Sequence, residues 1–200
     1  MTNSEIKKYI AEAVGTMFLT LVVALSLAGK FPVSTPVLAG ITLGLFVYSI
    51  GHISGAHINP AVTIGAWSIK KISDKEAISY VVSQFFGAAT SIIIMKICKI
   101  DFTSLVASDT LLTGFAELLG AAVFTFGIAS VIYGKTPKEI AGIVIGASLF
   151  LGIAVASLLG SNGILNPAVA FGIKSFGWMY VFGPIIGSVI GMQAYKYLSE

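Results

Sequence analysis

Two asparagines, Asn59 and Asn166, are the residues of this chain whose type and spacing bear most directly on chemistry. They stand 107 positions apart, each before Pro-Ala, inside the similar octapeptides 58–65 and 165–172. Asn can cap a helix, and Pro fits the first helical turn because it lacks the N–H that would go unpaired there. Each copy therefore predicts the start of a short helix. Two such starts facing one another would form a polar site at the centre of a membrane.

The composition predicts a membrane protein. Of the 200 residues, 56% are hydrophobic and only 10% are charged, and the mean hydropathy is +0.94. A soluble domain carries about 25% charged residues. The net charge of +3 is too small to indicate nucleic acid. The single cysteine, Cys98, excludes an internal disulfide, and together with two histidines it indicates no metal cluster. No cofactor is expected.

Six apolar runs are long enough to span a bilayer, which takes about 20 residues. They lie near 8–29, 35–53, 77–98, 110–132, 139–160 and 177–197. The segments 51–69 and 161–175 each contain one Asn-Pro-Ala and are apolar but broken by Gly, Asn and Pro. We expect re-entrant half-helices there. Non-helical backbone at membrane depth is tolerated only where it is buried or lines a watery cavity, so these segments predict a cavity.

The two halves of the chain resemble each other beyond the tripeptide. The segment 11–15 (Ala-Glu-Ala-Val-Gly) is similar to 116–120 (Ala-Glu-Leu-Leu-Gly), at an offset of 105. Each half has three full spans, and an odd number gives the second half the opposite orientation. The predicted fold is an all-α membrane protein with six transmembrane helices and two re-entrant half-helices. It forms a single domain over 1–200, with inverted repeats of about 1–103 and 104–200.

Lysine counts predict the orientation, because cytoplasmic loops carry an excess of basic residues. With both termini inside, eight lysines face the cytoplasm and four face outward. The inner set is Lys7, Lys8, Lys70, Lys71, Lys75, Lys135, Lys138 and Lys196, and the outer set is Lys30, Lys96, Lys99 and Lys174. We therefore expect cytoplasmic termini, in a multi-pass protein of the plasma membrane.

With these features the chain resembles the major intrinsic protein family, the aquaporins and glycerol facilitators. The resemblance covers nearly the whole chain. It depends on Ala11-Glu12 with Gly15-Thr16, on the loop 51–63, on 84–88 (Gln-Phe-Phe-Gly-Ala), on Glu117, on the second Asn-Pro-Ala, and on 183–187 (Gly-Pro-Ile-Ile-Gly). The resemblance implies a homotetramer in which each subunit has its own pore.

The resemblance also implies roles for particular residues. The central constriction would comprise Asn59, Pro60, Ala61, Asn166, Pro167 and Ala168. Backbone carbonyls would form acceptor ladders at Gly55, Ala56, His57, Ile58, Asn162, Gly163, Ile164 and Leu165. Glu12 and Glu117 would support the two loops by accepting hydrogen bonds from their backbone. A proton relay at these carboxylates and a pH gate at His57 are alternatives that the residues leave open.

The outer filter departs from the family pattern. Counting from the motifs gives Ala39, Ala154, Gly163 and Val169, all small or apolar. The family has an arginine at the position of Val169, and this chain contains no arginine at all. The filter loses a positive charge and a multi-donor fork, and we expect it to be wider than in water-selective members.

The leading function is a passive channel for water and small neutral solutes such as glycerol, urea, ammonia or hydrogen peroxide. It would exclude ions at the paired Asn-Pro-Ala site, where helix N-termini and amide donors disfavour cations. One alternative is a structural or adhesion protein with a vestigial pore. Another is a secondary transporter that uses Glu12 or Glu117 as a proton site. An enzyme is not expected, because no nucleophile–base pair or metal set is apparent.

Overall fold

The computed structural model describes residues 1–29, 32–101, 105 and 109–200. Lys30 and the predicted boundary between the repeats near 103–104 lie outside these residues. The described elements are all helical: α1 (Asn3–Ala28), α2 (Thr35–Ser54), α3 (Pro60–Ser68), α4 (Asp74–Ile97), α5 (Leu111–Ile132), the 3₁₀ turn η1 (Lys138–Ile140), α6 (Ala141–Leu158), α7 (Pro167–Gly172) and α8 (Met179–Ser199).

Among the described residues, five helices are long and apolar enough to cross a membrane: α1, α2, α4, α5 and α6 with its preceding 3₁₀ turn. The sixth predicted span corresponds to α8, which has 21 residues but does not meet the same hydropathy criterion. Its last turns contain Gln193 and Lys196, and Pro184 lies inside it. These residues lower its mean hydropathy, although α8 packs against α5 along much of its length.

Helices α1, α4 and α5 begin at side-chain caps. Thr2 and Glu5 form a reciprocal capping box at the start of α1. The Ser73 side chain accepts from Glu76 N–H at the start of α4, and the Thr110 side chain accepts from Thr113 N–H at the start of α5. Such caps satisfy backbone donors that have no partner within the helix. The predicted spans and the observed helices therefore agree to within a few residues at most ends.

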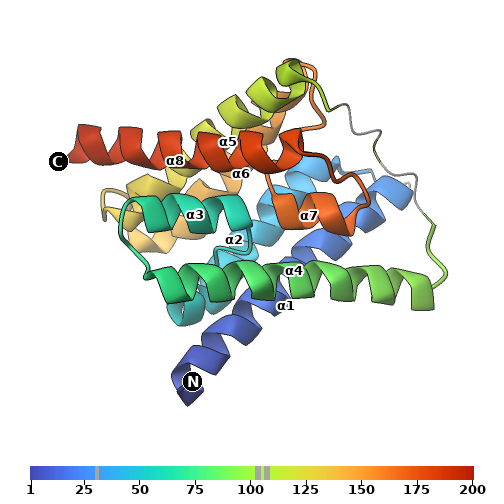
Figure 1. Ribbon diagram of the computed structural model, residues 1–200, viewed down its shortest axis with the longest axis horizontal. Coiled ribbons are helices and arrows are strands. Elements are labelled where there is room, and N and C mark those ends of the chain that lie inside the picture. Colours follow the sequence, from blue (N-terminus) through green and yellow to red (C-terminus); the bar gives the residue numbers. More distant parts are fainter. Residues whose placement is uncertain (30–31, 102–104, 106–108) are drawn as a thin grey trace.

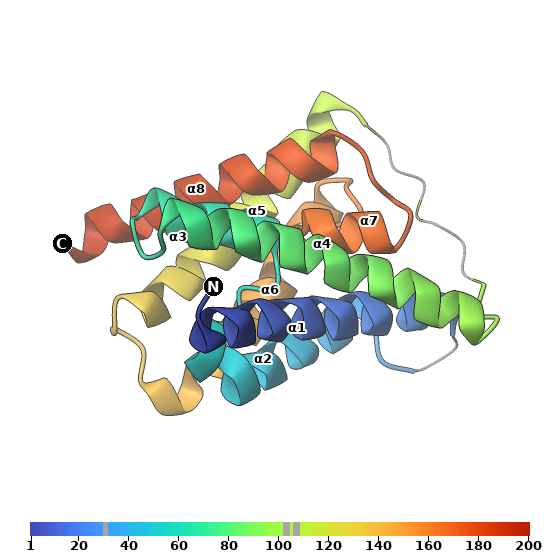
Figure 2. The ribbon, with the colours of Figure 1, turned by 60° about the horizontal axis from the view of Figure 1, so that its bottom comes forward.

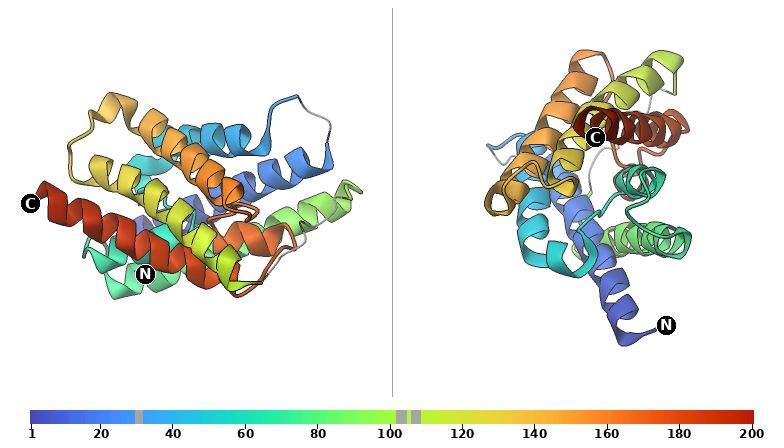
Figure 3. Two further views of the ribbon diagram at one scale, coloured as in Figure 1. Left: turned by 90° about the horizontal axis from the view of Figure 1, so that it is seen from above. Right: turned by 90° about the vertical axis from the view of Figure 1, so that its left-hand side faces the viewer.

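The two halves pack in the same way. Helix α1 packs against α4 and α5 against α8, while α2 packs against α6 across the two halves. At the α1–α4 contact, a Cβ on Gly87 would collide with the Ala13 carbonyl, and at the α5–α8 contact one on Gly187 would collide with the Leu118 carbonyl. Small residues let helices approach closely in lipid. The right-hand view of Figure 3 places α2 and α6 on one side of the molecule and α3 and α4 on the other.

The two short helices lie roughly end to end between α4 and α8 (Figure 1). Helix α3 packs against α8, and α7 packs against α4, so each half-helix contacts the other half of the chain. Their N-termini face each other near the middle of the bundle (Figure 1). This is the arrangement that the repeated Asn-Pro-Ala predicts.

Both chain termini lie toward the same end of the bundle (Figure 2). There, Lys8 pairs with Glu76 at 2.6 Å and Lys75 pairs with Glu5 at 2.7 Å, joining the first turns of α1 and α4. Ion pairs of this kind, screened by solvent, contribute little to stability. They align the ends of two helices but do not account for the fold.

Candidate functional site

The asparagine side chains join the two halves by crossed hydrogen bonds. Asn59 Nδ2 donates to the Leu165 carbonyl at 2.9 Å, and Asn166 Nδ2 donates to the Ile58 carbonyl at 3.0 Å. Each side-chain oxygen caps its own half-helix, accepting from Ala61 N–H at 2.8 Å and from Ala168 N–H at 3.1 Å. An amide NH₂ has two donor hydrogens. The crossed bond uses one of them and leaves the second available to a molecule beside the pair.

Two buried carboxylates hold the loops that precede the half-helices. Glu12 accepts from His57 N–H at 2.9 Å, from Ile58 N–H at 2.6 Å and from the Ser54 hydroxyl at 2.7 Å. In the second half, Glu117 accepts from Ile164 N–H at 3.0 Å, from Leu165 N–H at 2.7 Å and from the Ser161 hydroxyl. Both glutamates are fully buried. Their oxygens are occupied by loop donors, as the scaffold role requires.

The backbone conformation of the loops repeats as well. Ala56 and Ile58 have φ of 50° and 41°, and the equivalent Gly163 and Leu165 have 64° and 55°. A left-handed φ is uncommon for residues with a side chain and must be held by surrounding contacts. The carboxylates receive the N–H groups of the residues at 57, 58, 164 and 165. Because a trans peptide points its N–H and C=O in opposite directions, the carbonyls of 56, 57, 163 and 164 point away from them.

Two buried tyrosines, one on α4 and one on α8, form hydrogen bonds with the loops. The Tyr80 hydroxyl donates to the Ser54 carbonyl at 2.8 Å, and the Tyr180 hydroxyl accepts from Asn162 Nδ2 at 2.9 Å. They are 100 residues apart, as are Gly87 and Gly187. Hydropathy and the Asn-Pro-Ala repeat do not predict the role of this pair, although the shared offset of 100 is a signal that could have revealed it.

Glu12 in the first half has a further polar partner, Gln84 on α4. Gln84 Nε2 donates to Glu12 at 2.8 Å and to Thr63 Oγ1 at 2.9 Å. The residue at the same offset of 100 is Pro184, which carries no side-chain donor. The His57 ring lies beside Tyr80 with its Nδ1 at 3.2 Å from Thr63 Oγ1. Gln84 and His57 thus add side-chain contacts to the loop at 55–58 beyond those of Glu12 and Ser54.

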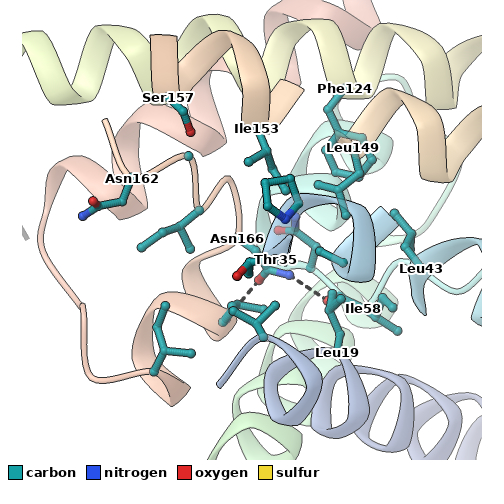
Figure 4. A pocket seen from close by; sticks show the side chains of 18 of the residues that line it. Leu19, Thr35, Leu43, Ile58, Phe124, Leu149, Ile153, Ser157, Asn162 and Asn166 are labelled. Carbon is teal, nitrogen blue, oxygen red and sulfur yellow. Dashed lines mark hydrogen bonds between the residues drawn. The ribbon is translucent and has the colours of Figure 1, made fainter. Parts of the chain in front are cut away.

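A cavity of about 230 Å³ runs from the ends of α1 and α2 down to both asparagines. Figure 4 shows Asn166 in the cavity wall with its bond to Ile58, and Ser157 and Asn162 farther out. Most of its remaining lining is aliphatic or aromatic. The apolar lining includes Leu19, Val23, Leu27, Leu43, Leu105, Phe124, Leu149, Ile153 and Ile173.

The predicted outer-filter residues are partly brought together. Ala39, Gly163 and Val169 line the cavity, and Ala154 does not. On α6 the lining residues are Leu149, Ile153 and Ser157, spaced at four-residue intervals on one helix face. If Ile153 is the outer-filter residue of α6, counting from the motif gave a residue one position too far toward the C-terminus. The sequence alone does not show which face of α6 lines the cavity.

The carbonyl-ladder residues are also partly on the cavity wall. His57, Ile58, Asn162, Gly163 and Ile164 line it, whereas Gly55, Ala56 and Leu165 are not among its lining residues. Pro60, Ala61, Pro167 and Ala168 are buried at the junction of the half-helices, behind the asparagines. Within the described part of the chain, no group of three or more His, Cys, Asp or Glu could hold a metal ion.

The sequence profile of the major intrinsic protein family matches residues 1–195. The chain belongs to the major intrinsic protein family. Among curated relatives, the probable aquaporin AqpM of Archaeoglobus fulgidus is 31% identical, with both chains covered in full. Aquaporin Z of Bradyrhizobium diazoefficiens is 32% identical over 98% of this chain and 95% of its own length.

A solved structure supports the fold of this family member. The X-ray structure of the aquaglyceroporin from Plasmodium falciparum is similar with a TM-score of 0.67 at 19% identity, covering 98% of this chain and 96% of that one. At this identity the similarity shows the fold alone. The aquaporin fold predicted from the repeats is therefore confirmed, and the chain is an aquaporin-family membrane protein.

Proposed function

We propose that this chain is a passive transmembrane channel for water and small neutral solutes such as glycerol, urea, ammonia or hydrogen peroxide. The observation that carries the proposal is the crossed pair of asparagine bonds at the inner end of the cavity. Each asparagine retains one N–H that can donate to a passing oxygen. A neutral molecule can accept from these donors and turn, whereas a cation meets only donors there.

The cavity wall favours solutes with both polar and apolar parts. The polar strip of the wall consists of the loop residues 162–164, with their carbonyls, and the amide donors of the two asparagines. Aliphatic residues such as Leu43, Leu149 and Ile153 line much of the rest. An apolar wall does not compensate the desolvation of a polar molecule. A permeant must therefore keep its hydrogen bonds to the polar strip or to accompanying water, as glycerol and urea can.

The position of Val169 supports a wide outer filter. Its side chain lies on the cavity wall, next to a helix start whose Asn166 cap also accepts from Val169 N–H at 3.3 Å. An arginine here would bring a charge and five donors into the cavity. Valine supplies neither, so selection at this level depends on the size of the opening.

We further propose that the channel works as a homotetramer in the plasma membrane, with both termini cytoplasmic and ions excluded at the asparagine pair. Purified channels in a planar bilayer should carry no measurable cation or proton current while they pass neutral solutes. A current comparable with that of a dedicated proton channel would contradict this part of the proposal.

The test of the proposed function is stopped-flow light scattering on proteoliposomes, with wild type, Val169→Arg and the matched apolar control Val169→Leu. We expect the wild type to pass water and to re-swell in glycerol or urea. The arginine variant should slow re-swelling by about tenfold or more and reduce water flux less, because the guanidinium narrows and charges the filter. A wild type that passes neither water nor solutes would overturn the proposal and favour a structural role.

A further inference from the structure

The cavity that reaches the asparagines has a shallow end and a deep end. It opens where α1 ends at Ala28 and α2 begins at Thr35. From there α1, α2 and α6 each line it with residues about one turn apart, which are Leu27, Val23 and Leu19, then Thr35, Ala39 and Leu43, then Ser157, Ile153 and Leu149. Four residues of a helix rise about 6 Å, so Leu19, Leu43 and Leu149 lie about two turns below the opening.

The predicted filter residues that line the cavity above this level are small. Ala39, Gly163 and Val169 carry nothing larger than an isopropyl group. The cavity volume of about 230 Å³ accommodates several water molecules. A solute in the upper part of the cavity can therefore keep water around it, because these short side chains leave room for that water.

Phe124 on α5 adds a large side chain to the cavity wall. It is only 1% exposed, and a Cβ on Gly152 would lie 3.1 Å from Phe124 Cβ, so α6 packs against the base of this side chain. Leu19 is its counterpart in the first half, because the two are 105 residues apart, as are Glu12 and Glu117. The repeat thus places a leucine and a phenylalanine at equivalent points of the two halves.

These large apolar side chains gather at the level of the asparagines. In Figure 4 the bond from Asn166 to Ile58 is drawn between Phe124 and Leu149 on one side and Leu19 on the other. The asparagine N–H groups donate from one part of the wall at this level, and hydrocarbon faces them. Since hydrocarbon does not compensate for lost water, a solute that passes here gives up hydration on its apolar side.

We propose, on the basis of the channel function proposed above, that the deep ring of Leu19, Leu43, Leu149 and Phe124 sets the size limit of the permeant, with Phe124 as its main specificity-determining residue. A short neutral solute such as glycerol crosses with its hydroxyl groups toward the asparagines and its C–H groups toward the ring. A longer polyol must place further hydrated groups against hydrocarbon, so the ring excludes it. The small side chains of the outer filter do not set this limit.

The test measures re-swelling of proteoliposomes in glycerol and in erythritol by stopped-flow light scattering. The readout is the ratio of erythritol to glycerol permeability, because a loss of folded channel lowers both alike. Phe124→Leu supplies the side chain that the first half has at Leu19 and should raise this ratio. Phe124→Ala should raise it by about tenfold or more, since a tight apolar site discriminates by about that factor per methylene. The converse variant Leu19→Phe should lower glycerol permeability more than water permeability.

Val169→Ala and Ile153→Ala are the matched controls, because both shorten side chains of the cavity wall nearer its opening, and both should leave the ratio unchanged. A ratio that rises as much in these controls as in Phe124→Ala, or that stays constant in both Phe124 variants, would overturn the ring as the size limit and leave the channel function intact. If the wild type passes water alone, Phe124→Ala must gain glycerol permeability for the size limit to stand. A wild type that passes neither water nor solutes would overturn the channel function and this limit together.

Discussion

Glu12 and Glu117 are the residues whose chemistry the structure limits most. Each carboxylate accepts two backbone N–H groups and a serine hydroxyl from the loop it faces. A group that exchanged protons with a permeant would need at least one oxygen open to the cavity, and neither glutamate lines it. The contacts favour support of the loops over the alternative of a proton relay.

Replacing either glutamate with glutamine should destabilise the protein. One backbone N–H, at Ile164 or Leu165 in the second half, would lose its acceptor and face an NH₂ group instead. A buried donor without a partner costs about 1–3 kcal/mol. We expect Glu12→Gln and Glu117→Gln to lower the melting temperature in detergent, whereas the exposed Glu139→Gln does not.

The same variants test the transporter alternative. Solute flux into proteoliposomes should be independent of an imposed proton gradient in the wild type and in both variants. A flux that follows the gradient in the wild type, and loses this dependence in Glu117→Gln at an unchanged melting temperature, would show that the carboxylate is a proton site.

The hydroxyls of Tyr80 and Tyr180 join helices α4 and α8 to the loops before the half-helices. Tyr80→Phe and Tyr180→Phe each remove one hydroxyl that hydrogen-bonds the segment before the half-helix of the same half of the chain, at Ser54 and Asn162 respectively. Each change should cost about 0.5–1.5 kcal/mol. Because the tyrosines contact different loops, the double variant should show an additive loss within about 0.5 kcal/mol, measured by reversible unfolding in mixed micelles. Strong non-additivity would show that the loops are coupled through the asparagine bonds.

At the scale of helices, close packing depends on single glycines. A methyl group at Gly87 would meet the backbone of α1 at the Ala13 carbonyl, a group that cannot move aside as a flexible side chain can. Gly87→Ala should therefore lower the yield of folded protein. Gly51 in α2 is the matched control, since the nearest atom to an added Cβ there is Val47 Cγ1 at 4.0 Å. Gly51→Ala should be neutral or stabilising by up to about 1 kcal/mol, because Ala favours the helix. Size-exclusion profiles of the two variants check this.

The sequence predicted the elements better than the lining of the cavity. Hydropathy and the repeated Asn-Pro-Ala were sufficient to predict the helices and half-helices, because both signals are local patterns in the sequence. Ile153 and Ser157 of α6 could not be identified as lining residues in this way. Helix α6 is apolar on all sides, with Leu149 and Ile153 buried and Phe150 and Leu151 exposed, so its hydropathy does not indicate which face meets the pore. That face depends on the crossing with α2.

At the scale of the whole molecule, the single cysteine is a natural reporter of orientation. Cys98 is exposed just after α4, at the end opposite the termini. In right-side-out vesicles, a membrane-impermeant maleimide should label the wild type from outside. The variant Cys98→Ser, Glu200→Cys should be labelled only after permeabilisation. The reverse pattern would place the termini outside and contradict the lysine count.

The crossed asparagine bonds have a consequence for synthesis. Asn59 reaches a carbonyl at position 165, and Asn166 reaches one at position 58. While a ribosome is still extending the chain, the first half has inserted its loop but has no partner for it. The paired asparagine site therefore assembles only when the second half-helix enters the membrane. An unfinished chain contains half of this pair, so the proposed channel would be completed in a single late step.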